Sequence, residues 1–233
     1  MKRIRTAVLA LSAAALAMAP AVASAPAEAA PKAAVGGGSG IIVNGKSACT
    51  MTAVGRDRAG RLVGLTAAHC GKLGSRVGLE RNRRAGQVGR IVTANPKLDY
   101  AVVLLDGSRV RPVRTVGKAR ITRVGTYPKP FSNVCKSGRT TGFSCGPTLT
   151  TGGRFVYNYV CSAPGDSGGP IMVGSRLVGM LNGIRRIAGP NTPPVFCVDP
   201  AFPVYTPMAA TPIRDVLRNL NGVPAIGAGF RVI

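Results

Sequence analysis

Several residue types are scarce in this chain of 233 residues. It contains no tryptophan, a single histidine, and only 8 aspartates and glutamates against 31 lysines and arginines. Zinc sites in proteins draw on clustered histidines and cysteines. The lone histidine and the lack of any Cys-x-x-Cys pair therefore argue against such a site, and we predict neither a metal ion nor a cofactor.

The N-terminal segment is predicted to be a secretory signal peptide over residues 1–27. Lys2, Arg3 and Arg5 precede an apolar run at 7–19, and small residues follow at 21–23 and 25–27. The apolar run is too short to span a membrane, and no second one follows it. We therefore expect a secreted, extracellular protein without a membrane span.

Export changes the interpretation of the cysteines, because an even number outside the cytosol favours disulfides over metal ligands. The six cysteines are Cys49, Cys70, Cys135, Cys145, Cys161 and Cys197. The residues alone leave their pairing open.

The formal net charge is +23 at pH 7. A field of this strength concentrates anionic partners near the surface, so we expect attraction to anionic polymers of the cell surface. The basic residues are scattered and no DNA-reading motif accompanies them, which argues against specific nucleic-acid binding. We expect a monomer.

The fold is predicted to be all-β. Short β-type runs alternate with turns, and the chain has 31 glycines and 18 prolines. Residues 28–40 are predicted to form a flexible leader because they are small and have nothing to bury. A domain is expected over 41–222, with lobes at about 41–112 and 120–222 joined by the charged stretch 107–123, and a C-terminal tail over 223–233.

One helix is predicted near the C-terminus, with Thr211 as its N-cap, Pro212 at its first position and Gly222 at its end. Its apolar residues recur with helical spacing and should face the body of the protein. They are Ile213, Val216, Leu217 and Leu220.

A serine in a glycine-rich turn is the first sign of chemistry. Ser167 lies in Gly-Asp-Ser-Gly-Gly-Pro at 165–170, where backbone N–H groups can converge on a substrate carbonyl. The same pattern fits the nucleophile elbow of α/β-hydrolases, but there the histidine follows the serine in the chain. No histidine follows Ser167, because His69 is the only one.

His69 ends a β-type run beside Cys70, and Asp99 precedes an apolar strand. Taken singly, each has an ordinary structural interpretation. Together with Ser167 they stand in the chain order of the trypsin-like peptidases, which this sequence resembles over about residues 41–220. The segments Val-Cys-Lys-Ser-Gly-Arg-Thr-Thr-Gly-Phe-Ser-Cys-Gly at 134–146 and Cys-Ser-Ala-Pro-Gly-Asp-Ser at 161–167 are more similar to the secreted bacterial streptogrisins and α-lytic protease.

This resemblance implies a chymotrypsin-like fold of two antiparallel β-barrels with a short C-terminal helix. It also implies Ser167 as nucleophile, His69 as base, Asp99 as the residue orienting the imidazole, and the N–H groups of Gly165 and Ser167 as the oxyanion hole. Disulfides Cys49–Cys70, Cys135–Cys145 and Cys161–Cys197 follow from it. We further predict that Arg139 pairs with Asp166 and holds the nucleophile turn, without cleavage to release a new N-terminus.

The resemblance also places the substrate pocket. Its expected walls are Cys161, Ser162, Ala163, Pro164, Leu181, Asn182, Gly183 and Ile184. Asn182 stands where relatives usually have a serine that supports the aspartate, and its amide can still donate to Asp99. Ile184 replaces a glycine and would narrow the mouth.

Cys161 occupies the position where basic-specific relatives have an aspartate, so we predict a preference for small to medium apolar residues before the cleaved bond. Arg185 and Arg186 keep acidic residues as an alternative. The predicted function is a secreted serine endopeptidase acting on proteins or peptides. The competing hypothesis is a catalytically idle protease fold that binds anionic polymers through its basic surface.

Overall fold

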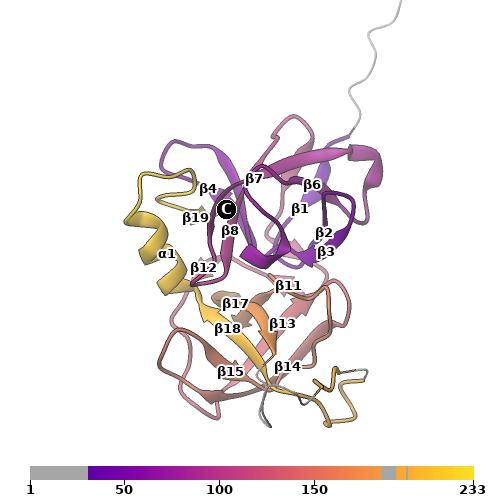
Figure 1. Ribbon diagram of the computed structural model, residues 1–233, viewed down its shortest axis with the longest axis vertical. Coiled ribbons are helices and arrows are strands. Elements are labelled where there is room, and N and C mark those ends of the chain that lie inside the picture. The colour runs from indigo at the N-terminus through magenta and orange to yellow at the C-terminus, as the bar shows by residue number, and fades with distance from the viewer. Residues whose placement is uncertain (1–30, 185–192, 198) are drawn as a thin grey trace, which may run out of the picture. The chain divides into compact units, whose positions relative to one another are not determined.

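The computed structural model describes residues 31–184, 193–197 and 199–233. The predicted signal peptide therefore lies outside the described residues. Two β-sheets make up most of this part of the chain, and each forms one lobe. Figure 1 shows the first lobe, coloured indigo to magenta, next to the second lobe in pink to orange.

The first lobe is an eight-stranded sheet. In spatial order its strands are β19 (Arg231–Val232), β4 (Ala53–Arg56), β5 (Leu62–Thr66), β8 (Tyr100–Leu105), β7 (Gln87–Asn95), β6 (Arg76–Leu79), β2 (Gly40–Val43) and β3 (Ser47–Thr50). Side chains alternate between the two faces of a strand. Along β8, Val103 therefore faces the core of the first lobe, while Val102 faces a second core shared with the other lobe. Burial on both faces explains why β8 is apolar throughout.

The second lobe is a seven-stranded sheet. Its strands are, in order, β12 (Arg123–Val124), β17 (Arg176–Ile184), β16 (Pro170–Val173), β13 (Asn133–Gly138), β14 (Gly142–Thr150), β15 (Val156–Asn158) and β18 (Met208–Pro212). β18 also pairs with β17, so the six strands from β17 to β18 close into a barrel. The first lobe stays a curled sheet, because among the described strands its edges β3 and β19 do not pair with each other.

Two segments predicted to be flexible or peripheral belong to the folded body. Ala33–Val35, within the expected leader, form β1, which pairs in parallel with β9 (Val110–Pro112). Ala33 and Val35 are buried, which gives this segment apolar surface to cover. The expected tail contains β19, which pairs with β4. The remaining short strands, β10 (Thr115–Val116) and β11 (Ala119–Arg120), pair with each other between the lobes.

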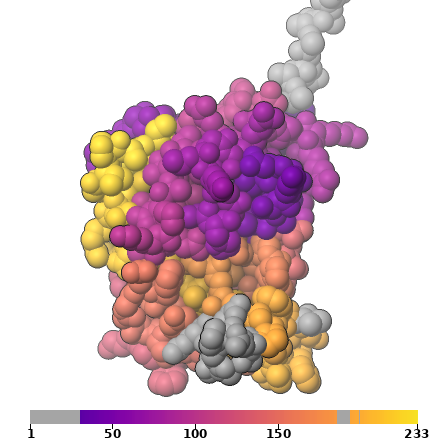
Figure 2. Space-filling model, in the orientation of Figure 1, coloured from indigo at the N-terminus to yellow at the C-terminus, as the bar shows by residue number. Residues whose placement is uncertain are grey.

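The helix α1 covers Ile213–Asn221 and buries Ile213, Val216 and Leu220 in the core shared by both lobes. In Figures 1 and 2 this yellow segment lies against one side of the first lobe. The helix ends at Gly222 as predicted, but Thr211 is not its N-cap. Thr211 belongs to β18, and its N–H and hydroxyl are bonded to other groups.

Two 3-10 turns, over Ala68–Cys70 and Arg83–Ala85, complete the elements. None of the helices in the described ranges is both long and apolar enough to cross a membrane.

Candidate active site

His69 and Asp99 lie side by side in two turns of the first lobe. His69 belongs to the 3-10 turn that follows β5, and Asp99 lies in the turn between β7 and β8. His69 Nδ1 is 2.8 Å from Asp99 Oδ2, and the His69 backbone N–H donates to Asp99 Oδ1 at 3.0 Å. A carboxylate can only accept, so Nδ1 carries the proton and Nε2 is left free to act as a base. The hydrogen bond that His69 donates to Asp99 raises the pKa of His69, although burial opposes it.

Ser167 comes from the second lobe and lines the same cavity as His69. The turn that carries it is fastened to β3 of the first lobe, because the Thr50 N–H donates to the Ser167 carbonyl at 2.8 Å and the Thr50 hydroxyl donates to the Gly165 carbonyl at 2.9 Å. Ser167 Oγ donates to the Asn182 carbonyl at 3.3 Å, not to His69. Bonds between a nucleophile and its base are often loose without substrate. The structure thus brings the three predicted triad residues together, without a hydrogen bond between Ser167 and His69.

The turn before Ser167 exposes two amide groups. Gly165 has φ +99°, a conformation that favours glycine. Within the described ranges, the N–H groups of Gly165 and Ser167 donate to no carbonyl, whereas the Asp166 N–H donates to the Ala163 carbonyl at 3.1 Å. Two free, neighbouring N–H groups are the donors that an oxyanion requires.

Asp166 is held by Lys136, not by Arg139, so the predicted Arg139–Asp166 pair is wrong. Lys136 Nζ lies 3.0 Å from Asp166 Oδ2, and both side chains are fully buried. The other two ammonium protons meet the Thr141 hydroxyl and the Gly142 carbonyl. Burial alone would raise the pKa of Asp166, but the Lys136 charge and hydrogen bonds from Thr141 outweigh it and keep that pKa lowered.

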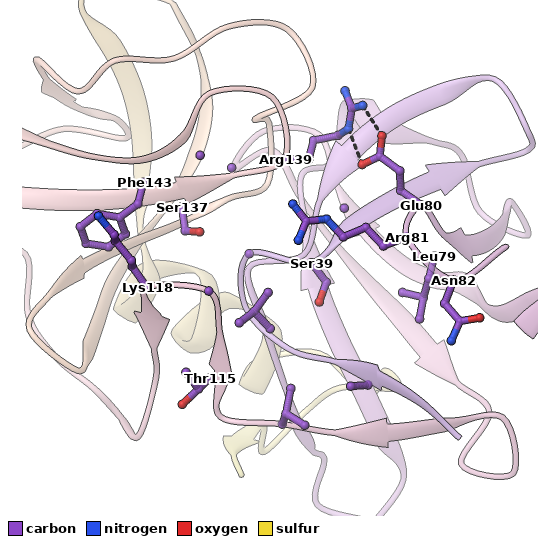
Figure 3. Close-up of a pocket in the computed structure, with 18 residues that line it drawn as sticks. Ser39, Leu79, Glu80, Arg81, Asn82, Thr115, Lys118, Ser137, Arg139 and Phe143 are labelled. Atoms are coloured by element: carbon purple, nitrogen blue, oxygen red, sulfur yellow. Dashed lines mark hydrogen bonds and ion pairs between the residues drawn. The ribbon is translucent and has the colours of Figure 1, made fainter. Parts of the chain in front are cut away.

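Arg139 lies in the turn beyond β13 and points to the first lobe, where its guanidinium pairs with Glu80 (Figure 3). The segment around Arg139 still contributes to Asp166, because the N–H groups of Thr140 and Thr141 donate to Asp166 Oδ1 at 2.8 and 3.1 Å. The chain thus contacts Asp166 here through backbone groups, while the arginine side chain joins the lobes.

The signal for Lys136 is present in the sequence. Along β13, Val134 and Lys136 are two residues apart and share the buried face. Arg139 falls after the strand has ended, so strand alternation does not direct it inward.

A cavity of about 250 Å³ lies beside Ser167, where the substrate pocket is predicted. Of the expected wall residues all but Cys161 line it, and Phe196 and Met208 line it in addition. Cys161 is buried in its disulfide. Phe196 and Met208 were missed because they come from segments distant in sequence. None of the described lining residues is acidic, and Arg185 and Arg186 lie outside the described residues.

The disulfides join the pairs that the resemblance implies: Cys49–Cys70, Cys135–Cys145 and Cys161–Cys197. The first ties the His69 turn to β3. Cys49, His69 and Cys70 lie close enough to suggest a metal site. The Cys49 and Cys70 sulfurs form a disulfide with each other, however, so neither is available as a thiolate ligand.

Residues 43–199 match the family described as Trypsin, a stretch that covers more than half of the chain. The chain belongs to the trypsin family. This membership makes it a serine endopeptidase that acts on proteins or peptides.

Two curated relatives support the assignment. The chain is 27% identical over 168 residues to Serine protease 2 of Streptomyces fradiae, and the match covers 64% of this chain and 94% of that protein. It is 29% identical over 162 residues to Streptogrisin-C of Streptomyces griseus, covering 63% of this chain but only 34% of the relative. The match therefore spans about a third of the length of Streptogrisin-C.

Solved structures share the fold of this trypsin-family chain. Protease A of Thermobifida fusca matches with a TM-score of 0.65 at 22% identity, covering 83% of this chain and 99% of that one. A Cellulomonas bogoriensis chymotrypsin matches with a TM-score of 0.63 at 24% identity, covering 86% and 98%. A glutamic acid specific serine protease, described as using a histidine triad in substrate binding, matches with a TM-score of 0.63 at 22% identity, covering 82% and 100%.

Proposed function

We propose that this trypsin-family peptidase is secreted and cleaves peptide bonds with Ser167 as nucleophile, His69 as general base and Asp99 as the group that orients His69. The observation that carries the proposal is the bond of 2.8 Å between His69 Nδ1 and Asp99 Oδ2, in the cavity that Ser167 also lines. A paired imidazole next to a serine in a turn with free amides is the arrangement that acyl transfer needs.

In the proposed reaction, Ser167 Oγ attacks the substrate carbonyl while His69 Nε2 takes the hydroxyl proton. The negative charge on the carbonyl oxygen is stabilised by the N–H groups of Gly165 and Ser167, each worth about 3 kcal/mol of the barrier. His69 then gives its proton to the leaving amine, which departs and leaves an acyl-enzyme. Water, activated by His69, hydrolyses this ester and restores Ser167.

The buried Lys136–Asp166 pair fixes the turn that supplies these amides. Asp166 precedes Ser167 directly, so its carboxylate determines how the chain runs from Gly165 to Ser167. Lys136 is an internal side chain, so its pair with Asp166 does not depend on a free N-terminal amine. We infer that the oxyanion hole forms without a cleavage that would create a new N-terminal amine.

The pocket favours apolar side chains before the cleaved bond. Its described walls have no carboxylate that would attract lysine or arginine. The glutamic acid specific neighbour is described as binding substrate with three histidines, whereas this chain has only His69, which the mechanism already uses. Small to medium apolar residues are therefore the proposed preference, ahead of acidic ones.

Secretion is supported by the predicted signal peptide and by the three disulfides, which persist in oxidising surroundings. The net charge of +23 supports weak, salt-sensitive attraction to anionic polymers in addition to catalysis. The hypothesis of an idle protease fold is not favoured, because all three residues of the reaction are present and gathered.

Labelling with a fluorophosphonate probe tests the assignment. We expect stoichiometric labelling of the mature protein, none in Ser167→Ala, and strongly reduced labelling in His69→Ala. A peptide library should then show cleavage after small or medium apolar residues. Unlabelled wild-type protein would overturn the catalytic assignment, and dominant cleavage after lysine or arginine would overturn the interpretation of the pocket.

A further inference from the structure

The side-chain amide of Asn182 makes two bonds to one residue. Asn182 Nδ2 donates to Asp99 Oδ2 at 2.9 Å and also to the Asp99 main-chain carbonyl at 2.9 Å. A primary amide has two protons, and here both go to Asp99. The same side chain therefore holds the carboxylate and the backbone of the residue that orients His69.

The other end of the amide is held just as firmly. Asn182 Oδ1 accepts from the Thr211 N–H at 2.7 Å and lies 2.7 Å from the Thr211 hydroxyl, which also faces the Leu98 carbonyl. Thr211 is fully buried and Asn182 is 5% exposed. Turning the amide over would set its protons against the Thr211 N–H and its oxygen against the Asp99 oxygens. Thr211 thus decides which end of Asn182 faces Asp99.

The backbone of Asp99 needs this support. Asp99 has φ +50°, in the left-handed region, which few residues other than glycine, asparagine and aspartate adopt. Its carbonyl accepts from the Ala68 N–H at 3.2 Å as well as from Asn182. These two bonds to the Asp99 main-chain carbonyl fix the turn that carries the Asp99 carboxylate, which must meet His69.

We propose that Asn182, oriented by the Thr211 backbone N–H, is a positioning residue that holds the Asp99 carboxylate against the His69 imidazole. This inference rests on the proposed catalytic roles of His69 and Asp99. Asn182 makes more bonds here than the serine that relatives usually have at this position could make. A serine hydroxyl has one proton and could serve only one of the two Asp99 oxygens, and its shorter side chain would leave the buried Thr211 N–H without its acceptor.

The single histidine of the chain makes the proposal measurable without activity, because every imidazole signal in an NMR titration of the full-length mature protein belongs to His69. The hydrogen bond that His69 donates to the Asp99 carboxylate is the main cause that raises the pKa of His69. If Asn182 positions Asp99, its removal lets the carboxylate turn away, and His69 should titrate at lower pH in Asn182→Ala than in the wild type. A purely electrostatic role would have the opposite sign, since a carboxylate that loses a donor holds the imidazolium more tightly.

Activity should also fall when Asn182 is replaced. Misplacement of a catalytic group by about 1 Å can cost roughly 100-fold in rate, and we expect a loss of kcat/KM of roughly this size in Asn182→Ala. Asn182→Ser should recover part of it but not all. Thr211→Val keeps the backbone N–H that orients the amide, so its His69 titration should stay close to that of the wild type.

Asn44→Ala is the matched control. The Asn44 amide also bonds at both ends, to the Ser75 hydroxyl and the Arg76 N–H, and Asn44 also has a positive φ, but it lies in the β2–β3 turn. It should lose stability and leave the His69 titration unchanged.

An unchanged or raised His69 pKa in Asn182→Ala, or full activity in Asn182→Ser, would overturn this inference while fluorophosphonate labelling of the wild type still supports the proposed function. Absence of labelling in the wild type would instead overturn the proposed function.

Discussion

Lys136 and Arg139 lie three residues apart on the β13–β14 hairpin, yet their ion pairs have different surroundings. Lys136 and Asp166 are both fully buried, whereas the side chains of Arg139 and Glu80 are 24% and 23% exposed. The buried pair lies within the second lobe and adjoins the nucleophile turn. The partly exposed Arg139–Glu80 pair joins the two lobes at the edge of the cavity in Figure 3.

The difference shows that the position of a cationic residue along the strand decides whether its ion pair is buried or exposed to solvent. Inside β13, the pleat turns Lys136 toward the core, where each of its three protons has an acceptor. A buried charge that loses its partner is costly, while a pair near water gains little. The two pairs should therefore respond very differently to the same kind of substitution.

The largest effect is expected from Lys136→Met, which leaves the Asp166 carboxylate buried and unpaired. Removing one partner of a buried pair costs about 3–5 kcal/mol of unfolding free energy, and the displaced turn should also lose fluorophosphonate labelling at Ser167. Urea unfolding measures the first effect and labelling the second. Adding Asp166→Asn to Lys136→Met should recover part of the stability, and a Lys136→Met variant as stable as the wild type would remove the distinction between the pairs.

A smaller effect is expected from acid. The folded-state pKa of Asp166 is lowered, so its contribution to stability is complete above the ordinary carboxyl range near 4 and is lost as pH falls through the lower folded value. The unfolding free energy of the wild type should fall over that range more steeply than that of the Lys136→Met, Asp166→Asn double variant. Equal slopes in denaturant titrations from pH 6 to pH 2 would contradict this.

Much of the site was predictable from sequence because its residues sit in local patterns. The glycine turn around Ser167 and the strand ends beside His69 and Asp99 are short-range signals, and the structure brings these residues together. The expectations that failed depended on distant partners. Thr211 looks like a helix cap until Asn182 and Leu98 take its polar groups, and the apolar pattern of Ala33–Val35 is too short to reveal that it pairs with β9.

To predict which of Lys136 and Arg139 pairs with Asp166, one must know which residues of the strand face the core. Both cations lie in the motif that resembles the streptogrisins, and arginine is the better partner for a carboxylate in general. Only the alternation of β13, with Val134 inward, distinguishes them. Asp166 is reached by the residue on the inward face, even though that residue is the lysine.

The smallest effect is expected from Arg139→Ala, and it separates the observed pairing from the predicted one. A partly exposed ion pair contributes about 0–1 kcal/mol and weakens with salt. Arg139→Ala should therefore cost no more than about 1 kcal/mol of unfolding free energy at low salt, less at high salt, and should leave Ser167 labelling intact. Glu80→Gln is the matched control and should lose a similar amount, while the double variant should lose no more than either single one. If Arg139→Ala abolished labelling and Glu80→Gln did not, the guanidinium would be acting on Asp166 after all, and the comparison between the two pairs would fail.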